Sequence, residues 1–239
     1  DRAMSLTDSA KPFEPFIFIR GKEDNKGPEV PRRFLAVLAS GERQPFAHGS
    51  GRLDLAKQIA SPDNPLTARV MANRVWHWMF GQGLVRTTDD FGATGEAPSH
   101  PELLDWLAIE FRRSGWDVKA FYRLALTSTT YRQAAVQTPV KVEKDRDNSL
   151  FSRGPRFRMD AEMIRDYALA ASGSLSPKMG GPGTRPYQPS NIWGAGSNIG
   201  NPRYDQDTGE SLYRRTIYNF WKRQAPSPNM EIFNAPARE

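Results

Sequence analysis

Residues 64–83 read NPLTARVMANRVWHWMFGQG, and this stretch predicts the long helix that decides the fold class. Asn64 stands where an N-cap side chain accepts from the free backbone N–H groups of the first turn. Pro65 follows at the first helical position, where its missing N–H costs nothing. Glycine ends helices by adopting the left-handed conformation, so Gly81-Gln82-Gly83 marks the stop and the helix is predicted over 65–80.

A second helix is predicted over 100–113. Ser99 and Glu102 match a capping box, in which Ser99 accepts from the N–H of Glu102 and the glutamate side chain reaches back. Asp117 is placed to cap a third helix. Apolar residues follow the capping box at helical spacing, and these are Leu103, Leu104, Leu107 and Phe111.

The remaining elements are a fourth helix, two short strands and a long loop. Asp160 is placed to cap the helix, which is predicted over 161–172. The runs 16–19 and 216–221 are β-branched and aromatic, which is typical of buried strands. Residues 174–210 are rich in Gly, Pro, Asn and Ser, and so long a loop in a compact domain is usually functional or mobile. We therefore expect a mainly α fold, a helical domain with long irregular loops and a few short strands.

Composition limits the kinds of partner. Basic residues number 33 and acidic residues 27, and the net charge of +6 favours anionic partners such as sulfated glycans, nucleic acid or an acidic protein. The alternative is a mildly basic, solvated surface. No Lys/Arg block with interleaved aromatics occurs, so nucleic acid is not an expected partner. No apolar run approaches the roughly 18 residues that a membrane-spanning helix needs, so no membrane span is expected.

Cysteine is absent, which removes disulfides, thiolate nucleophiles, Cys-ligated zinc and c-type haem attachment from this segment. The three histidines are not paired at the i,i+4 spacing of a helical metal motif. Asp145 and Asp147 resemble the start of a calcium loop, but the Gly and Glu that such a loop requires do not follow. We expect no cofactor and no structural metal.

The helix at 65–80 begins a series of motifs that resembles the DUF1553 domain of planctomycete and verrucomicrobial proteins. The motifs follow one another in the family's order over roughly residues 50 to 235. They are 64–70 with 73–76, 83–87 with 90–92, 100–105, 128–133, 158–162 with 164–166, and 220–223.

This resemblance implies a domain organisation and a cellular setting, although it carries no established activity. Residues 1–50 are expected to form an extended, loop-rich N-terminal arm, and residues 51–239 a DUF1553-like helical domain that is incomplete at its C-terminus. Domains of this family are usually found beside DUF1549 and cytochrome c-like domains of the same protein. The parent proteins are typically exported, to the periplasm or cell surface, in genomes rich in sulfatases and polysaccharide-degrading enzymes.

The predicted helix at 65–80 carries the strongest candidate for a ligand-binding face. Arg69, Asn73 and His77 stand at i, i+4 and i+8 and so share one stripe, with Trp76 beside it. A guanidinium, an amide, an imidazole and an indole together suit an anionic or sugar ligand. The alternative is structural: Arg69 and Asn73 satisfy loop carbonyls while Trp76 packs in the core.

Arg158 is a second candidate, and we expect it to lie near this stripe. It precedes Asp160, so it could hold an anion at a helix N-terminus, where the dipole and the free N–H groups assist. Arg153, Arg156 and Arg165 lie in the same stretch, and with Glu162 they could equally form an arginine–carboxylate network that ties helices together.

Catalytic residues are not identified by the sequence. Two carboxylates across a cleft could cleave a glycosidic bond as acid and base, but Glu102 and Asp90 are equally suited to caps or turns. No Ser stands in a nucleophile elbow of the G-x-S-x-G kind. The other acidic candidates are Asp89, Glu96 and Asp105.

Three functions from different classes remain open. The leading one is an ancillary, non-catalytic module of an exported multidomain protein that engages anionic, for example sulfated, polysaccharide. The second is a polysaccharide-acting hydrolase or lyase that uses Asp/Glu with Arg/His. The third is a docking scaffold for a cytochrome c-like domain.

Overall fold

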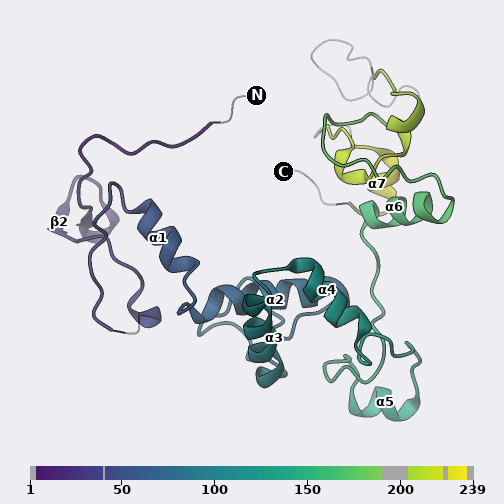
Figure 1. Ribbon diagram of the computed structural model, residues 1–239, viewed down its shortest axis with the longest axis horizontal. Coiled ribbons are helices and arrows are strands. Elements are labelled where there is room, and N and C mark those ends of the chain that lie inside the picture. The colour runs from purple at the N-terminus through teal and green to yellow at the C-terminus, as the bar shows by residue number, and fades with distance from the viewer. Residues whose placement is uncertain (1–3, 40, 190–203, 223–225, 236–239) are drawn as a thin grey trace. The chain divides into compact units, whose positions relative to one another are not determined.

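A computed structural model describes residues 4–39, 41–189, 204–222 and 226–235 (Figure 1). The chain divides into two compact units, Asp1–Arg156 and Phe157–Glu239, and each is described by itself. Helices hold 39% of the described residues and strands 5%, so the predicted mainly α class is confirmed. In the described ranges, no helix is both long and apolar enough to span a membrane.

The first unit begins with an arm that contains a small hairpin. Strand β1 (Phe16–Phe18) pairs antiparallel with β2 (Lys26–Glu29); the 3₁₀ turn η1 (Ile19–Gly21) lies between them, and η2 (Ala36–Leu38) follows β2. A strand at 16–19 was predicted to be buried, and this was wrong because the β1 side chains are exposed. Two strands alone cannot cover their own apolar side chains.

Two packed helices form the centre of the first unit. Helix α2 (Pro65–Phe80) packs on α3 (Pro101–Arg113), close to the predicted bounds. Asn64 caps α2 by accepting from the N–H of Leu66 at 2.9 Å. Gly81 ends α2 with a φ of 78°, as its lack of a Cβ permits.

The core lies along the inner faces of these helices. Trp76 stacks on Phe80 with ring centroids 4.0 Å apart, and Phe151 meets both rings edge-on. The other large buried side chains in this cluster are Val75, Met79, Leu84, Val85, Leu104, Leu107, Phe111 and Phe121. The helices are therefore held mainly by apolar burial, each such side chain contributing about 1.5–3 kcal/mol.

The caps predicted at Asp117 and at Ser99 have different outcomes. Asp117 caps α4 (Val118–Thr127), because it accepts from the N–H of Ala120 at 3.0 Å. The capping box at Ser99 was wrong: His100 is the N-cap residue of α3. The Ser99 hydroxyl instead donates to the carbonyl of Leu84, which shows that a tertiary contact replaced the local one.

The first unit also contains α1 (Arg52–Ile59), between the arm and α2, and the short α5 (Pro139–Lys144). Within the loop that follows α5, the buried carboxylate of Asp145 accepts from the N–H groups of Leu150 and Ser152. Asp145 thus organises this loop through hydrogen bonds to its backbone.

The second unit contains α6 (Ala161–Ala171), the 3₁₀ turns η3 (Gly209–Tyr213) and η4 (Thr216–Tyr218), and α7 (Pro228–Ile232). The strand predicted over 216–221 was wrong. Its first residues form η4, because the carboxylate of Asp166 on α6 accepts from both the N–H and the hydroxyl of Thr216. Only an isolated bridge from Asn219 to Thr184 is strand-like there.

Candidate functional site

Two members of the predicted ligand-binding stripe on α2 lie inside the first unit. Asn73 is fully buried, and its amide donates to the Val85 carbonyl and accepts from the Val85 N–H, both at 2.9 Å. Trp76 is only 5% exposed and packs in the aromatic core. These are the contacts expected if Asn73 satisfies a loop carbonyl and Trp76 packs in the core.

The other two members are half-buried. Arg69 donates to Asp105 on α3 at 2.6 Å and to the carbonyl of Pro65 at 2.8 Å. The Arg69 guanidinium lowers the pKa of Asp105 below its ordinary value. His77 has a buried Nδ1 that finds no partner among the described residues. A ligand-binding role for the stripe stays a prediction.

Arg69 lines a small hollow between α2 and α3 of about 270 Å³. Arg112 lies on the other side of this hollow and donates to the carbonyl of Pro62. Two guanidiniums therefore border one space, but Asp63 and Asp105 line it as well. The balance of charge makes this hollow a poor match for a free anion.

Arg158 lies in the second unit, where it is exposed just before α6. Because the two units are described separately, its predicted proximity to Arg69 stays a prediction. Of the neighbouring arginines, Arg153 and Arg165 have structural contacts. Arg153 is buried and donates to the carbonyls of Asp145 and Arg146, both at 2.7 Å.

Most of the acidic candidates also have structural contacts. Asp89 pairs with Arg74 at 2.9 Å, and Asp105 pairs with Arg69. Asp90 closes a turn, where hydrogen bonds from Thr94 and then from the Gly92 N–H lower its pKa. The remaining two, Glu96 and Glu102, are exposed. In the part of the chain that the structure describes, no group of three or more His, Cys, Asp or Glu could hold a metal.

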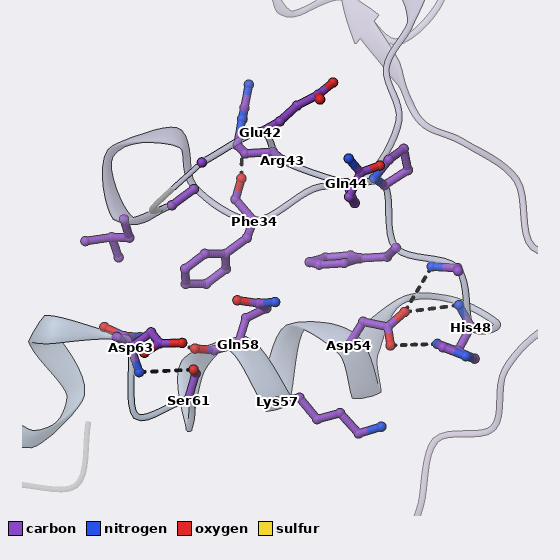
Figure 2. A pocket seen from close by; sticks show the side chains of 17 residues that line it. Phe34, Glu42, Arg43, Gln44, His48, Asp54, Lys57, Gln58, Ser61 and Asp63 are labelled. Atoms are coloured by element: carbon purple, nitrogen blue, oxygen red, sulfur yellow. Dashed lines mark hydrogen bonds and ion pairs between the residues drawn. The ribbon is translucent and has the colours of Figure 1, made fainter.

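A pocket of about 530 Å³ lies between α1 and the loop of residues 34–48 (Figure 2). Phe34 and Phe46 contribute phenyl rings to it, and both are half-buried. Gln58 extends from α1 toward Phe34, whereas Glu42 and Arg43 extend outward from the loop (Figure 2). Sequence reasoning did not identify this pocket, because its residues come from an arm without periodicity and from α1.

The loop over this pocket is held by one carboxylate. Asp54 on α1 accepts from the N–H groups of Ala47 and His48 at 3.1 and 3.0 Å, and contacts the His48 ring at 2.9 Å. The His48 N–H and then its ring lower the pKa of Asp54, although desolvation opposes them. Gly51 has a φ of 78°, and a Cβ there would lie 2.8 Å from the Phe46 ring.

The second unit has a larger and more apolar cleft, of about 880 Å³, bordered by α6, η4 and α7. Four of the chain's seven methionines line it, together with Trp221 and Phe220. Its charged residues are Glu162, Asp166 and Arg215, of which the last two lie 3.5 Å apart.

The wall of this cleft is tied together by Arg165. Its guanidinium donates to the carbonyls of Leu212 and Arg214 and to the hydroxyl of Thr216. Burial lowers the pKa of Arg165, and the charge of Asp166 opposes this shift. Arg165 is thus a structural cation that ties these segments of the second unit together.

Comparison with known proteins identifies the family. The model of the family described as PSD1, protein of unknown function (DUF1553), matches residues 51–239. The chain belongs to the DUF1553 family. No curated protein and no solved structure matched it.

The DUF1553 match covers every motif that carried the resemblance, and the structure gives several of them an architectural role. The motif at 64–76 forms the cap and body of α2 and supplies Asn73. The motif at 158–166 supplies Arg165 and Asp166, which hold η4 in the second unit. The pocket in Figure 2 lies partly outside the match, because residues 34–48 precede it.

Proposed function

We propose that this DUF1553 chain is a non-catalytic module that binds anionic polysaccharide. The observation that carries the proposal is the concentration of unpaired positive charge in residues 113–156, called the basic segment below. It holds nine basic and four acidic residues, a net charge of +5 out of +6 for the whole chain.

The basic segment exposes these charges instead of pairing them. Seven of its basic side chains are exposed and have no hydrogen-bond or ion-pair partner among the described residues. They are Arg113, Lys119, Arg123, Arg132, Lys144, Arg146 and Arg156. Unpaired surface cations raise the local potential and attract a polyanion, and the attraction weakens with salt.

Two of the segment's four acidic residues do little to cancel these charges. Asp117 is occupied as the cap of α4, and Asp145 is buried against backbone N–H groups. The carboxylates considered for acid–base catalysis also lie mostly in ion pairs and turns. These contacts support a binding role over a hydrolase or lyase.

Binding to dextran sulfate, with uncharged dextran as the comparison, tests the proposal. The chain is expected to bind dextran sulfate alone, with an affinity that falls steeply between about 0.05 and 0.3 M NaCl. Lys119→Glu with Arg123→Glu reverses two charges on one face of α4 and should weaken binding by about tenfold.

The matched control is Lys11→Glu with Lys22→Glu, which makes the same change of charge on exposed residues of the arm. It should change the affinity by less than about twofold if the basic segment is the binding surface. Equal losses in the two double variants would show a response to net charge alone. That result, or no binding of dextran sulfate, contradicts the proposal.

We propose further that the parent protein is exported and carries DUF1549 and cytochrome c-like domains beside this module. This part rests on the family resemblance. Detection of the full-length protein in a surface or periplasmic fraction is the expected result, and its confinement to the cytoplasmic fraction would contradict it.

A further inference from the structure

We infer that the pocket between α1 and the loop of residues 34–48 binds one pyranose unit of a saccharide chain (Figure 2). The inference rests on the proposed function only for the choice of a saccharide as ligand, and the unit assigned to this pocket is an uncharged one. It stands on a separate observation, because the residues of this pocket lie outside the basic segment.

The first argument is the mixture of groups in the pocket. Phe34 and Phe46 supply apolar rings, and the C–H face of a pyranose can pack on such a ring. Gln58 supplies both a donor and an acceptor, and Figure 2 shows it directed toward Phe34. A sugar ring matches this combination, because it has an apolar face that can pack on the phenyl rings and hydroxyl groups that can hydrogen-bond to the amide.

The second argument is the balance of charge. The basic side chains Arg43 and Lys57 line the pocket, and so do the acidic side chains Glu42 and Asp63. The one further carboxylate, on Asp54, is occupied by the loop. A phosphate-bearing ligand such as a nucleotide would therefore meet no excess of positive charge, whereas a neutral polar ligand meets no penalty.

The third argument is that the pocket is preformed. Asp54 anchors one end of the loop through three contacts, and the Arg43 guanidinium donates to the carbonyl of Phe34 at 3.3 Å. The N–H of Phe46 donates to the carbonyl of Arg32 at 2.8 Å, and Arg32 pairs with Glu14. A ligand that enters a preformed pocket loses less affinity to the ordering of loops.

The size of the pocket leaves room for a sugar ring. The pocket has a volume of about 530 Å³, within the roughly 300–1,000 Å³ of small-molecule sites. The pocket is open to solvent, so the neighbouring units of a saccharide chain can extend outward from it.

The experiment uses the whole chain and three neutral probes: xylohexaose, mannohexaose and chitohexaose. Saturation-transfer NMR detects binding, and calorimetry measures the affinity. At least one probe is expected to bind, and Gln58→Ala should weaken that binding by about tenfold, because the donor and acceptor of the amide are lost. Phe34→Ala should weaken it by a similar factor, about tenfold, through loss of the ring.

Gln137→Ala is the matched control for Gln58→Ala, because Gln137 is exposed and far along the sequence from the pocket. It should leave the affinity within about twofold of the parent. Gln58 is also exposed, so its variant is expected to fold, and the amide NMR spectrum of each variant verifies this.

The outcomes separate this inference from the proposed function. Failure of all three probes to bind, or binding that Gln58→Ala and Phe34→Ala leave unchanged, overturns the pocket assignment even when dextran sulfate binds. Conversely, binding of a probe that depends on Gln58 but not on Lys119 and Arg123 supports the pocket even when dextran sulfate does not bind.

Discussion

The amide of Asn73 joins the body of α2 to the loop that follows it. It pairs with both backbone groups of Val85, and the side chain has no exposed surface. Gly83 lies against the same amide, and a Cβ there would approach its atoms to 2.8 Å. An asparagine that seemed able to face a ligand thus serves as a substitute for backbone pairing in a turn.

Asn73→Ala is therefore expected to destabilise the first unit by roughly 2–4 kcal/mol, because two buried backbone groups of Val85 lose their partner. Chemical unfolding followed by circular dichroism measures this. Asn25→Ala is the control, since Asn25 is exposed on the arm, and it should change stability by less than about 0.5 kcal/mol. A loss below about 1 kcal/mol at Asn73 would mean that water takes over both bonds.

At the scale of elements, single side chains attach the irregular segments to helices. Asp54 attaches the arm to α1, and Arg165 with Asp166 attaches η4 to α6. Such attachments replace the backbone ladders that regular strands would provide, because buried peptide groups need partners in any fold.

The attachment at Asp54 should depend on pH. Its folded pKa is lowered, so the ionised form contributes stability above the unfolded pKa, and this stability is lost as pH falls through the folded pKa. The amide NMR signals of Ala47 and His48 should show a transition below about pH 4, where the Asp54 carboxylate takes up a proton.

In Asp54→Asn the same two signals should differ from the parent at neutral pH and show no transition below pH 4. The carboxyl ¹³C shift of Asp54 gives the pKa directly. A value at or above that of an aspartate in a model peptide, about 3.9, would contradict the assigned hydrogen bonds.

At the scale of the whole molecule, the chain consists of two compact units, with the boundary after Arg156. All contacts described for Arg165 lie in the second unit, with Leu212, Arg214, Thr216 and Asp166. A substitution at Arg165 should therefore lower the stability of the second unit.

Arg165→Met is expected to leave three acceptors without their donor and to destabilise the second unit by about 3 kcal/mol or more. Hydrogen exchange followed by mass spectrometry should show faster exchange in peptides from 161–189 and 204–222 and unchanged exchange in α2 and α3. Asn73→Ala should give the opposite pattern. Faster exchange in both units from either variant would contradict this localisation.

The sequence by itself determined four of the helices, α2, α3, α4 and α6, and the stop of α2. The caps at Asn64 and Asp117 and the glycine at Gly81 act through neighbouring residues only, so they could be predicted without the fold. The family motifs from residue 64 onward could also be identified from the sequence, because each is continuous in the chain.

Only the tertiary structure decided which of the candidate side chains are buried. Helical spacing places Arg69, Asn73 and His77 on one stripe, but it does not say whether a loop covers that stripe, as Val85 covers Asn73. Likewise, the Ser99 hydroxyl donates to the carbonyl of Leu84, which is distant in sequence. Thr216 donates to Asp166, and the segment predicted as a strand there begins with η4. Burial and hydrogen-bond partners depend on residues far apart in the chain, so local patterns cannot specify them.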